Sequence, residues 1–228
     1  MKYLLIVITL ILIVAVIGSA QIRNSKHDLS FGSTTTGPKT TTSTYTEVCV
    51  FCHTPHSTQS TSLLWNRTAS TASYAVYSSP TMEQTVPQPG AVSKNCLSCH
   101  DGTITLASVV NNPGSSGGIA PVFTAPGKID TTVFTGIGTN LTNDHPIGFV
   151  YNTSRSTDAD LRTETVAGIK VTVNATSPTR SLTLYGTTAA SATLECGTCH
   201  DPHGVTGVPT FLRVSNSNSE LCFTCHVK

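Results

Sequence analysis

Charged and aromatic residues are scarce in this chain. Of its 228 residues, 11% are charged and 6% are aromatic, with one tryptophan and two methionines. Without Lys2, which belongs to the apolar leader discussed below, 12 basic and 12 acidic residues remain and the net charge is zero. Because there is no basic run and no charged patch, the sequence argues against nucleic-acid binding and against a partner that is attracted by long-range electrostatic forces.

Core-forming residues are also few once the leader is set aside. Serine and threonine together number 64 residues, about 28% of the chain. These short polar side chains suit strands, turns and solvated loops better than packed helices, so a large helical bundle is not expected. A chain with so little apolar material needs disulfides, metals or cofactors to fill its interior.

The one long hydrophobic run lies in residues 1–20. Lys2 provides a positive start, Leu4–Ile17 is apolar apart from Thr9, and Gly18-Ser19-Ala20 resembles a cleavage site. An uncleaved membrane anchor is the alternative, but the run falls short of the ~20 apolar residues that span a bilayer. The sequence therefore predicts a signal peptide and a secreted, extracellular or cell-surface protein.

All eight cysteines belong to four copies of one pattern, a C-x-x-C pair directly followed by a histidine. In a helical turn the positions i, i+3 and i+4 share one face, so both thiols and the imidazole point the same way. This geometry suits a haem, whose vinyl groups react with the thiols while the imidazole binds the iron. The pattern predicts four covalently attached haems c, bound by Cys49, Cys52, Cys96, Cys99, Cys196, Cys199, Cys222 and Cys225, with His53, His100, His200 and His226 as first axial ligands.

Three other uses of C-x-x-C pairs, in zinc sites, disulfides and thioredoxin-like redox chemistry, fit this pattern less well. Structural zinc does not need a histidine after every second cysteine, and four disulfides would leave these histidines unexplained. Thioredoxin-like chemistry normally uses one such pair, on a helix of an α/β sheet. Four copies behind a signal peptide favour haem attachment over all three.

Four histidines lie outside the motifs, and four irons each require a second axial ligand. Methionine cannot supply the second axial ligand for most of the irons, because Met82 is the only methionine outside the leader. The matching numbers predict bis-histidine haems, which are closed to substrate and of lower potential than His/Met haems. The predicted second ligands are His27, His56, His145 and His203.

Proline residues favour this role for two of the four histidines. His56 and His203 each follow a motif histidine by three residues, with Pro55 and Pro202 directly before them. Since proline disfavours helical conformation in the preceding residue, the chain should leave the attachment turn and direct the second histidine to a neighbouring haem.

The motif positions divide the chain into a signal peptide (1–20), an N-terminal arm with a Thr-rich linker (21–48) and a tetrahaem domain (49–228). The arm carries His27, which could reach its own subunit or the next one. Within the long region without a motif, alternating apolar residues predict a β-hairpin at about 165–188. The expected fold is mostly irregular and loop-rich, with short helices at the motifs, this hairpin, and a haem stack as the core.

Several local sequences resemble those of multihaem cytochromes with doubled C-x-x-C-H motifs. They are Ser25–Ser30, Cys52–His56, Asp144–Gly148 and Cys199–Gly204. Within that group, the chain is most similar to the tetrahaem extracellular cytochrome filaments of the outer-membrane cytochrome E type, the cytochrome nanowires. The resemblance implies a homopolymer with stacked bis-histidine haems, in which one second ligand comes from the adjacent subunit; position and reach favour His27.

The expected function is long-range electron transfer without enzymatic activity, through adjacent subunits to redox partners or an extracellular acceptor. A monomeric periplasmic shuttle is the first alternative. A multihaem reductase is the second, and would require an open iron with acid/base residues around it.

Overall fold

The computed structural model describes residues 22–56, 64–124, 127–176 and 179–227. The predicted signal peptide lies outside these residues. In the described part of the chain, no helix has the length and apolar character needed to cross a membrane.

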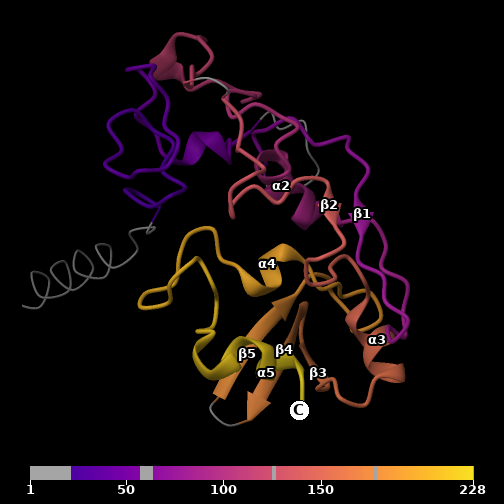
Figure 1. Ribbon diagram of the computed structural model, residues 1–228. Helices are drawn as coiled ribbons and strands as arrows, with labels where there is room; N and C mark the ends of the chain where they lie inside the picture. Colours follow the sequence, from indigo (N-terminus) through magenta and orange to yellow (C-terminus); the bar gives the residue numbers. More distant parts are fainter. Residues whose placement is uncertain (1–21, 57–63, 125–126, 177–178, 228) are drawn as a thin grey trace, which may run out of the picture.

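Most of the described chain consists of turns and loops, which confirms the expected loop-rich fold (Figure 1). Each of the four motifs begins or ends in a short helix, as predicted. These helices are η1 (Cys49–Phe51), α2 (Ala91–His100), α4 (Cys196–Cys199) and α5 (Glu220–Cys225). The other helices are η2 (Gly114–Ser116), α3 (Tyr151–Thr157) and η3 (Ser217–Ser219).

The predicted hairpin is present and belongs to a three-stranded antiparallel sheet. β4 (Lys170–Thr176) pairs with β5 (Thr179–Leu184), so that Val171 lies opposite Leu184 and Val173 opposite Leu182. All four side chains are at most 2% exposed, as their alternation indicated.

A third strand, β3 (Glu164–Ala167), pairs with the other edge of β4 and was not expected from the sequence. Its side chains are half-buried or exposed, so it has no apolar alternation to reveal it. Ile169 continues the pattern of β4 in sequence, yet it is 80% exposed because it lies in the turn from β3, where Gly168 has a φ of 61°.

The buried apolar residues in the described part of the chain form three small clusters. The largest joins β4 and β5 to Tyr151 and Leu194, and includes Cys225 of α5. A second surrounds Phe51 and Tyr45, and a third surrounds Leu97 of α2. Ile147 packs against both the first and the third. Figure 1 shows α2 in one half of the molecule, the sheet and α5 in the other, and α4 between them.

The Thr-rich segment 33–46 is packed against the rest of the chain. Thr40 forms an antiparallel bridge with Phe123, and its hydroxyl donates to the Val122 carbonyl at 2.8 Å. Tyr45 is fully buried. A second small sheet, the parallel pair β1 (Ala75–Val76) and β2 (Asn140–Leu141), lies beside α2 (Figure 1).

The apolar cluster that joins β4 and β5 to α5 should determine the stability of the C-terminal half. Leu182→Ala should lower the free energy of unfolding by about 2–5 kcal/mol, because it leaves a cavity between β5 and α5. Ile169→Ala, at an exposed turn, should change it by less than ~0.5 kcal/mol. Denaturant unfolding of the haem-loaded protein measures both, and equal effects would contradict the placement of the core.

Candidate haem-binding site

All eight motif cysteines lie in the described part of the chain, and none forms a disulfide. Within the described residues, no group of three or more His, Cys, Asp or Glu side chains could hold a metal ion by itself. The thiols therefore remain available for another bond, and a closed zinc site is not formed.

Neighbouring motifs bring their cysteines together in the order of the sequence. Cys52 of the first motif and Cys99 of the second share one apolar cluster. The thiols of Cys96 and Cys196 lie near each other, and this proximity raises the pKa of Cys96 and lowers that of Cys196. Burial, followed by the nearby Cys196 and Cys222, raises the pKa of Cys199 to about 11. The cysteines of the four motifs thus lie next to one another in the order in which the motifs occur in the sequence.

The contact between the second and third motifs depends on Glu195, a buried residue that the sequence analysis missed. The Ser93 hydroxyl of α2 donates to the Glu195 carboxylate, and the Cys196 N–H donates to Ser93 Oγ at 3.0 Å. Glu195 also forms a capping box with Thr198 at the start of α4. A Cβ at Gly90 would lie 2.1 Å from Glu195 Oε1, so glycine is required for this approach. In the sequence, the pairing of Glu195 with Thr198 three residues later was the signal that could have identified this residue.

Six of the eight histidines form three pairs, each of one motif histidine with one of the four spare histidines. Ring centres are 6.1 Å apart for His27 and His100, 6.2 Å for His53 and His203, and 6.5 Å for His145 and His226. The first and third pairs are close to perpendicular and the second is close to parallel, with interplanar angles of 80°, 67° and 13°.

These separations fit one metal ion between each pair of rings. A metal–imidazole bond is about 2.0 Å long, and the ring centre lies ~1.1 Å behind the bonded nitrogen, so two opposed ligands have centres roughly 6.2 Å apart. Rings inclined at a low angle lie closer in direct contact, as in the 4.3 Å contact of His27 with Phe211, so the separation is most informative for His53 and His203. Edge-to-face rings such as Phe51 and Phe123 lie 6.0 Å apart in direct contact. The donor set therefore fits bis-histidine iron at three of the four motifs.

Backbone carbonyls hold the rings of these pairs in place. The Nδ1 atom lies 2.7 Å from the Thr135 carbonyl in His100, 3.1 Å from that of Pro202 in His27, and 2.9 Å from that of Pro146 in His145. When Nδ1 donates a proton in such a contact, Nε2 is left as the metal-binding atom.

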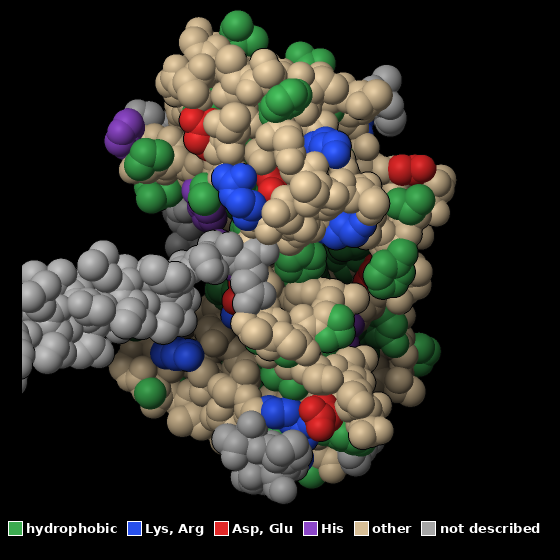
Figure 2. Space-filling model, turned by 90° about the vertical axis from the view of Figure 1, so that its left-hand side faces the viewer, with side chains coloured by type: hydrophobic (Ala, Val, Ile, Leu, Met, Phe, Trp, Pro, Cys, Tyr) green, Lys and Arg blue, Asp and Glu red, His purple; other side chains and the backbone are tan. Residues whose placement is uncertain are grey.

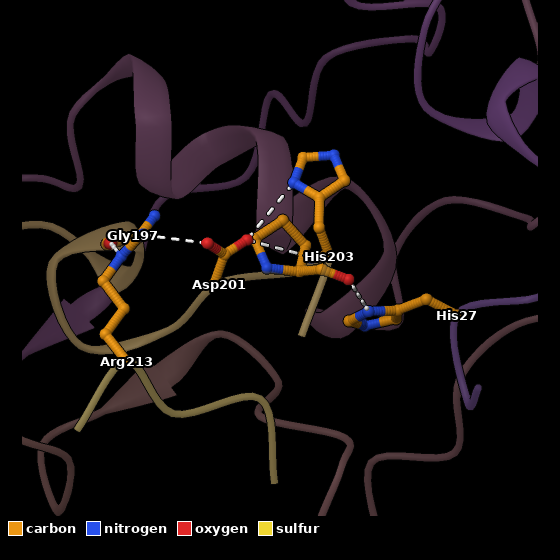
Figure 3. A network of polar contacts seen from close by, with 6 residues as sticks. His27, Gly197, Asp201, His203 and Arg213 are labelled. Carbon is orange, nitrogen blue, oxygen red and sulfur yellow. Dashed lines mark hydrogen bonds and ion pairs between the residues drawn. The ribbon is translucent and has the colours of Figure 1, made fainter. Parts of the chain in front are cut away.

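Figure 3 shows how the third motif supports two of the three pairs. Asp201 Oδ1 lies 3.2 Å from Nδ1 of His203, and its Oδ2 accepts a hydrogen bond of 2.9 Å from Arg213. The carbonyl of Pro202 contacts His27 between them. One loop after α4 therefore orients ligands for both the first and the second motif.

His56 and His200 form no such pair within the described part of the chain. His56 is exposed at the end of its segment, and its carbonyl accepts a hydrogen bond from Thr54 Oγ1. His200 belongs to the third motif and lies near the Thr210 carbonyl. The structure thus brings together three predicted ligand pairs and leaves one motif histidine and one spare histidine apart.

Burial favours the neutral, metal-binding form of two of the candidate ligands, His27 and His200. It is the main cause that lowers the pKa of His27, and the neighbouring His100 lowers it further. Burial also lowers the pKa of His200. The indole N–H of Trp65 is buried without a hydrogen-bond partner among the described residues, beside His53 at a ring distance of 5.7 Å. An orphaned donor at this place is consistent with a group that the protein binds there.

Comparison with known proteins gives one match, at the C-terminal end. The family described as the doubled CXXCH motif matches residues 189–228. This range contains the third and fourth motifs. It supports a multihaem c-type cytochrome with covalently bound haem c. No curated protein matches the chain significantly.

Asp28 should stabilise the turn that carries His27. Its buried carboxylate accepts hydrogen bonds from the Asn24 N–H at 2.7 Å and from the Ser30 hydroxyl at 2.5 Å. Burial raises the pKa of Asp28, but these hydrogen bonds outweigh it and the pKa lies below its ordinary value. Such a group stabilises the fold above about pH 3.9, and this stabilisation is lost as the pH falls through the folded-state pKa.

Asp28→Ala should therefore lower the free energy of unfolding at pH 7 by about 1–3 kcal/mol, and by clearly less at pH 3. Denaturant titrations at the two pH values measure this difference. Glu83→Ala, which removes an exposed carboxylate, is the control. A penalty for Asp28→Ala that does not depend on pH would show that the charge of this carboxylate is not what holds the turn.

Proposed function

We propose that this chain binds four haems c, each between two histidines, and transfers electrons without transforming a substrate. The observation that carries the proposal is the set of three histidine pairs with centre separations of 6.1–6.5 Å. Each pair joins a motif histidine to a spare histidine, which is the arrangement that six-coordinate iron requires.

The residues of the chain have three tasks in this function. The cysteines fix each porphyrin by its edge, the paired imidazoles occupy both axial positions, and the carbonyl contacts keep the imidazoles aligned. Bound haem c supplies a one-electron couple of iron. With both axial positions filled by protein, no position is left for substrate, water or dioxygen.

Proximity of the cysteines supports a continuous path from the first motif to the fourth. Cys52 lies near Cys99, Cys96 lies near Cys196, and Cys199 lies near Cys222. Electrons would pass between the haems in this order, from motif one to motif four or in reverse.

We further propose that the protein is secreted and assembles into an extracellular filament, with His56 of one subunit bound to the iron at His200 of the next. The sequence resemblance favoured His27 as the ligand donated between subunits. The contact of His27 with His100 of its own chain now supports His56 for that role. His56 is exposed and is the spare histidine without a partner in the described residues.

The low surface charge agrees better with a homopolymer than with a diffusing shuttle. On the face seen in Figure 2, Lys and Arg are scattered singly among uncharged polar groups, and so are Asp and Glu. A shuttle would use a charged docking face to meet its partners. A reductase remains the second candidate, because the iron at His200 would be open in a subunit that has not assembled.

Two histidine variants separate ligation within the subunit from ligation between subunits. His27→Ala should open one of the four irons whether or not subunits assemble. His56→Ala should attach four haems and remain unassembled, with one open iron that added imidazole closes without restoring filaments. Haem counting by mass, carbon monoxide binding after reduction, and electron microscopy measure these properties.

The outcomes test each part of the proposal separately. Filaments of His56→Ala with four low-spin irons would disprove ligation by His56 between subunits. A high-spin iron in intact assemblies of the unmodified protein would favour the reductase. Fewer than four attached haems in the unmodified protein would contradict the tetrahaem assignment itself.

A further inference from the structure

Arg67 is a buried cation without a counter-ion in the described part of the chain. Its side chain is 2% exposed. The two terminal nitrogens donate to the carbonyls of Leu106 at 3.0 Å and Thr105 at 2.8 Å. The third nitrogen, Nε, is buried and has no hydrogen-bond partner among the described residues. Carbonyls solvate the guanidinium in place of water, but they do not neutralise its charge.

This cation lies beside the first two haem motifs. The residue before it, Asn66, donates its N–H to the Cys52 carbonyl at 2.9 Å, so the segment 64–67 runs along the first motif. Arg67 itself forms a bridge with Val109, which packs in one cluster with Cys52 and Cys99.

Both contacts place the guanidinium near the attachment points of two haems. Asn66, directly before Arg67, is hydrogen-bonded to Cys52 of the first motif, and Val109, which forms the bridge with Arg67, packs in the cluster that holds Cys52 and Cys99 of the second.

The arginines near the other two motifs differ in this respect. Arg213, near the third motif, forms an ion pair of 2.9 Å with Asp201, so its charge is compensated. Arg162 donates to the Phe223 carbonyl of the fourth motif at an exposed position, where solvent screens its charge.

A buried cation affects the two redox states of a nearby iron unequally. The oxidised haem centre is one charge more positive than the reduced one, so a nearby fixed positive charge favours reduction. At the second motif the buried carboxylate of Asp101 acts in the opposite direction. We propose that Arg67 raises the reduction potentials of the haems at the first two motifs above the values that they would have without its charge. This inference rests on the proposed haem binding.

Removal of the charge should lower two of the four potentials. In Arg67→Gln, the ratio of reduced to oxidised haem at a fixed solution potential should fall about three- to tenfold at these two haems, or roughly 30–60 mV for a one-electron couple. Arg67→Lys loses the same forked contact but keeps a positive charge, so its potentials should stay near those of the unmodified protein. Redox titration at pH 6, with haems resolved by paramagnetic NMR, measures the shifts.

A second pair of variants leaves Arg67 in place. Val109→Glu should put a carboxylate next to the guanidinium and lower the same two potentials, whereas Val109→Gln should not. Unchanged potentials in Arg67→Gln, or equal shifts in Arg67→Gln and Arg67→Lys, would overturn the proposal. If Arg67→Gln loses its haems, the Val109 pair decides, and unchanged potentials in Val109→Glu overturn it. Four attached, low-spin haems in the same samples show that haem binding is intact, so a failure of this inference is distinct from a failure of the proposed function.

Discussion

The constraint on which the rest of the structure depends is the distance of about 6 Å between paired imidazoles. His27 and His100 are 73 residues apart in sequence, His145 and His226 are 81 apart, and His53 and His203 are 150 apart. A metal ion held by such a pair would close a long loop, as a disulfide does in small secreted proteins. Among the described residues, the apolar cluster around Phe51 shares no member with the other two, so the link between His53 and His203 would join parts of the chain that hydrocarbon packing leaves separate.

Small polar side chains make this architecture possible, and their abundance then has a structural reason. Thr198 and Thr224 lie inside C-x-x-C pairs and are fully buried, as is Ser98. The Thr224 hydroxyl donates to the Glu220 carbonyl at 3.0 Å, and the Ser98 hydroxyl donates to that of Asn95 at 2.6 Å. Each satisfies a backbone group of a very short helix while occupying little volume.

The sequence was sufficient to predict features that depend on short spacings. The four motifs, the short helices that carry them and the hairpin of β4 and β5 all follow from contacts between residues close in the chain. The alternation of Val171 and Val173 with polar residues was enough to show which face of β4 is buried.

Features that depend on contacts between distant residues could not be predicted in this way. The strand β3 has no periodicity of its own and forms because β4 offers a free edge. The pairing of His53 with His203 depends on how motif one meets motif three, through the loop after α4 that carries Asp201 and His203. The role of Arg67 was equally hidden, because a single arginine in a Ser/Thr-rich segment gives no sign that it will be buried.

The four motifs differ in whether their histidine has a second imidazole of the same chain opposite it, and this difference links assembly to reactivity. Three motif histidines already lie opposite a second imidazole of the same chain, whereas His200 forms no such pair with the described residues. An iron bound there would accept either an external ligand or His56 of a neighbour, and never both. Under the proposed ligation, polymerisation and substrate binding therefore compete for one coordination position. A chain that conducts electrons over long distances benefits from this competition, because each new subunit would remove the one site at which electrons could be lost to a small molecule.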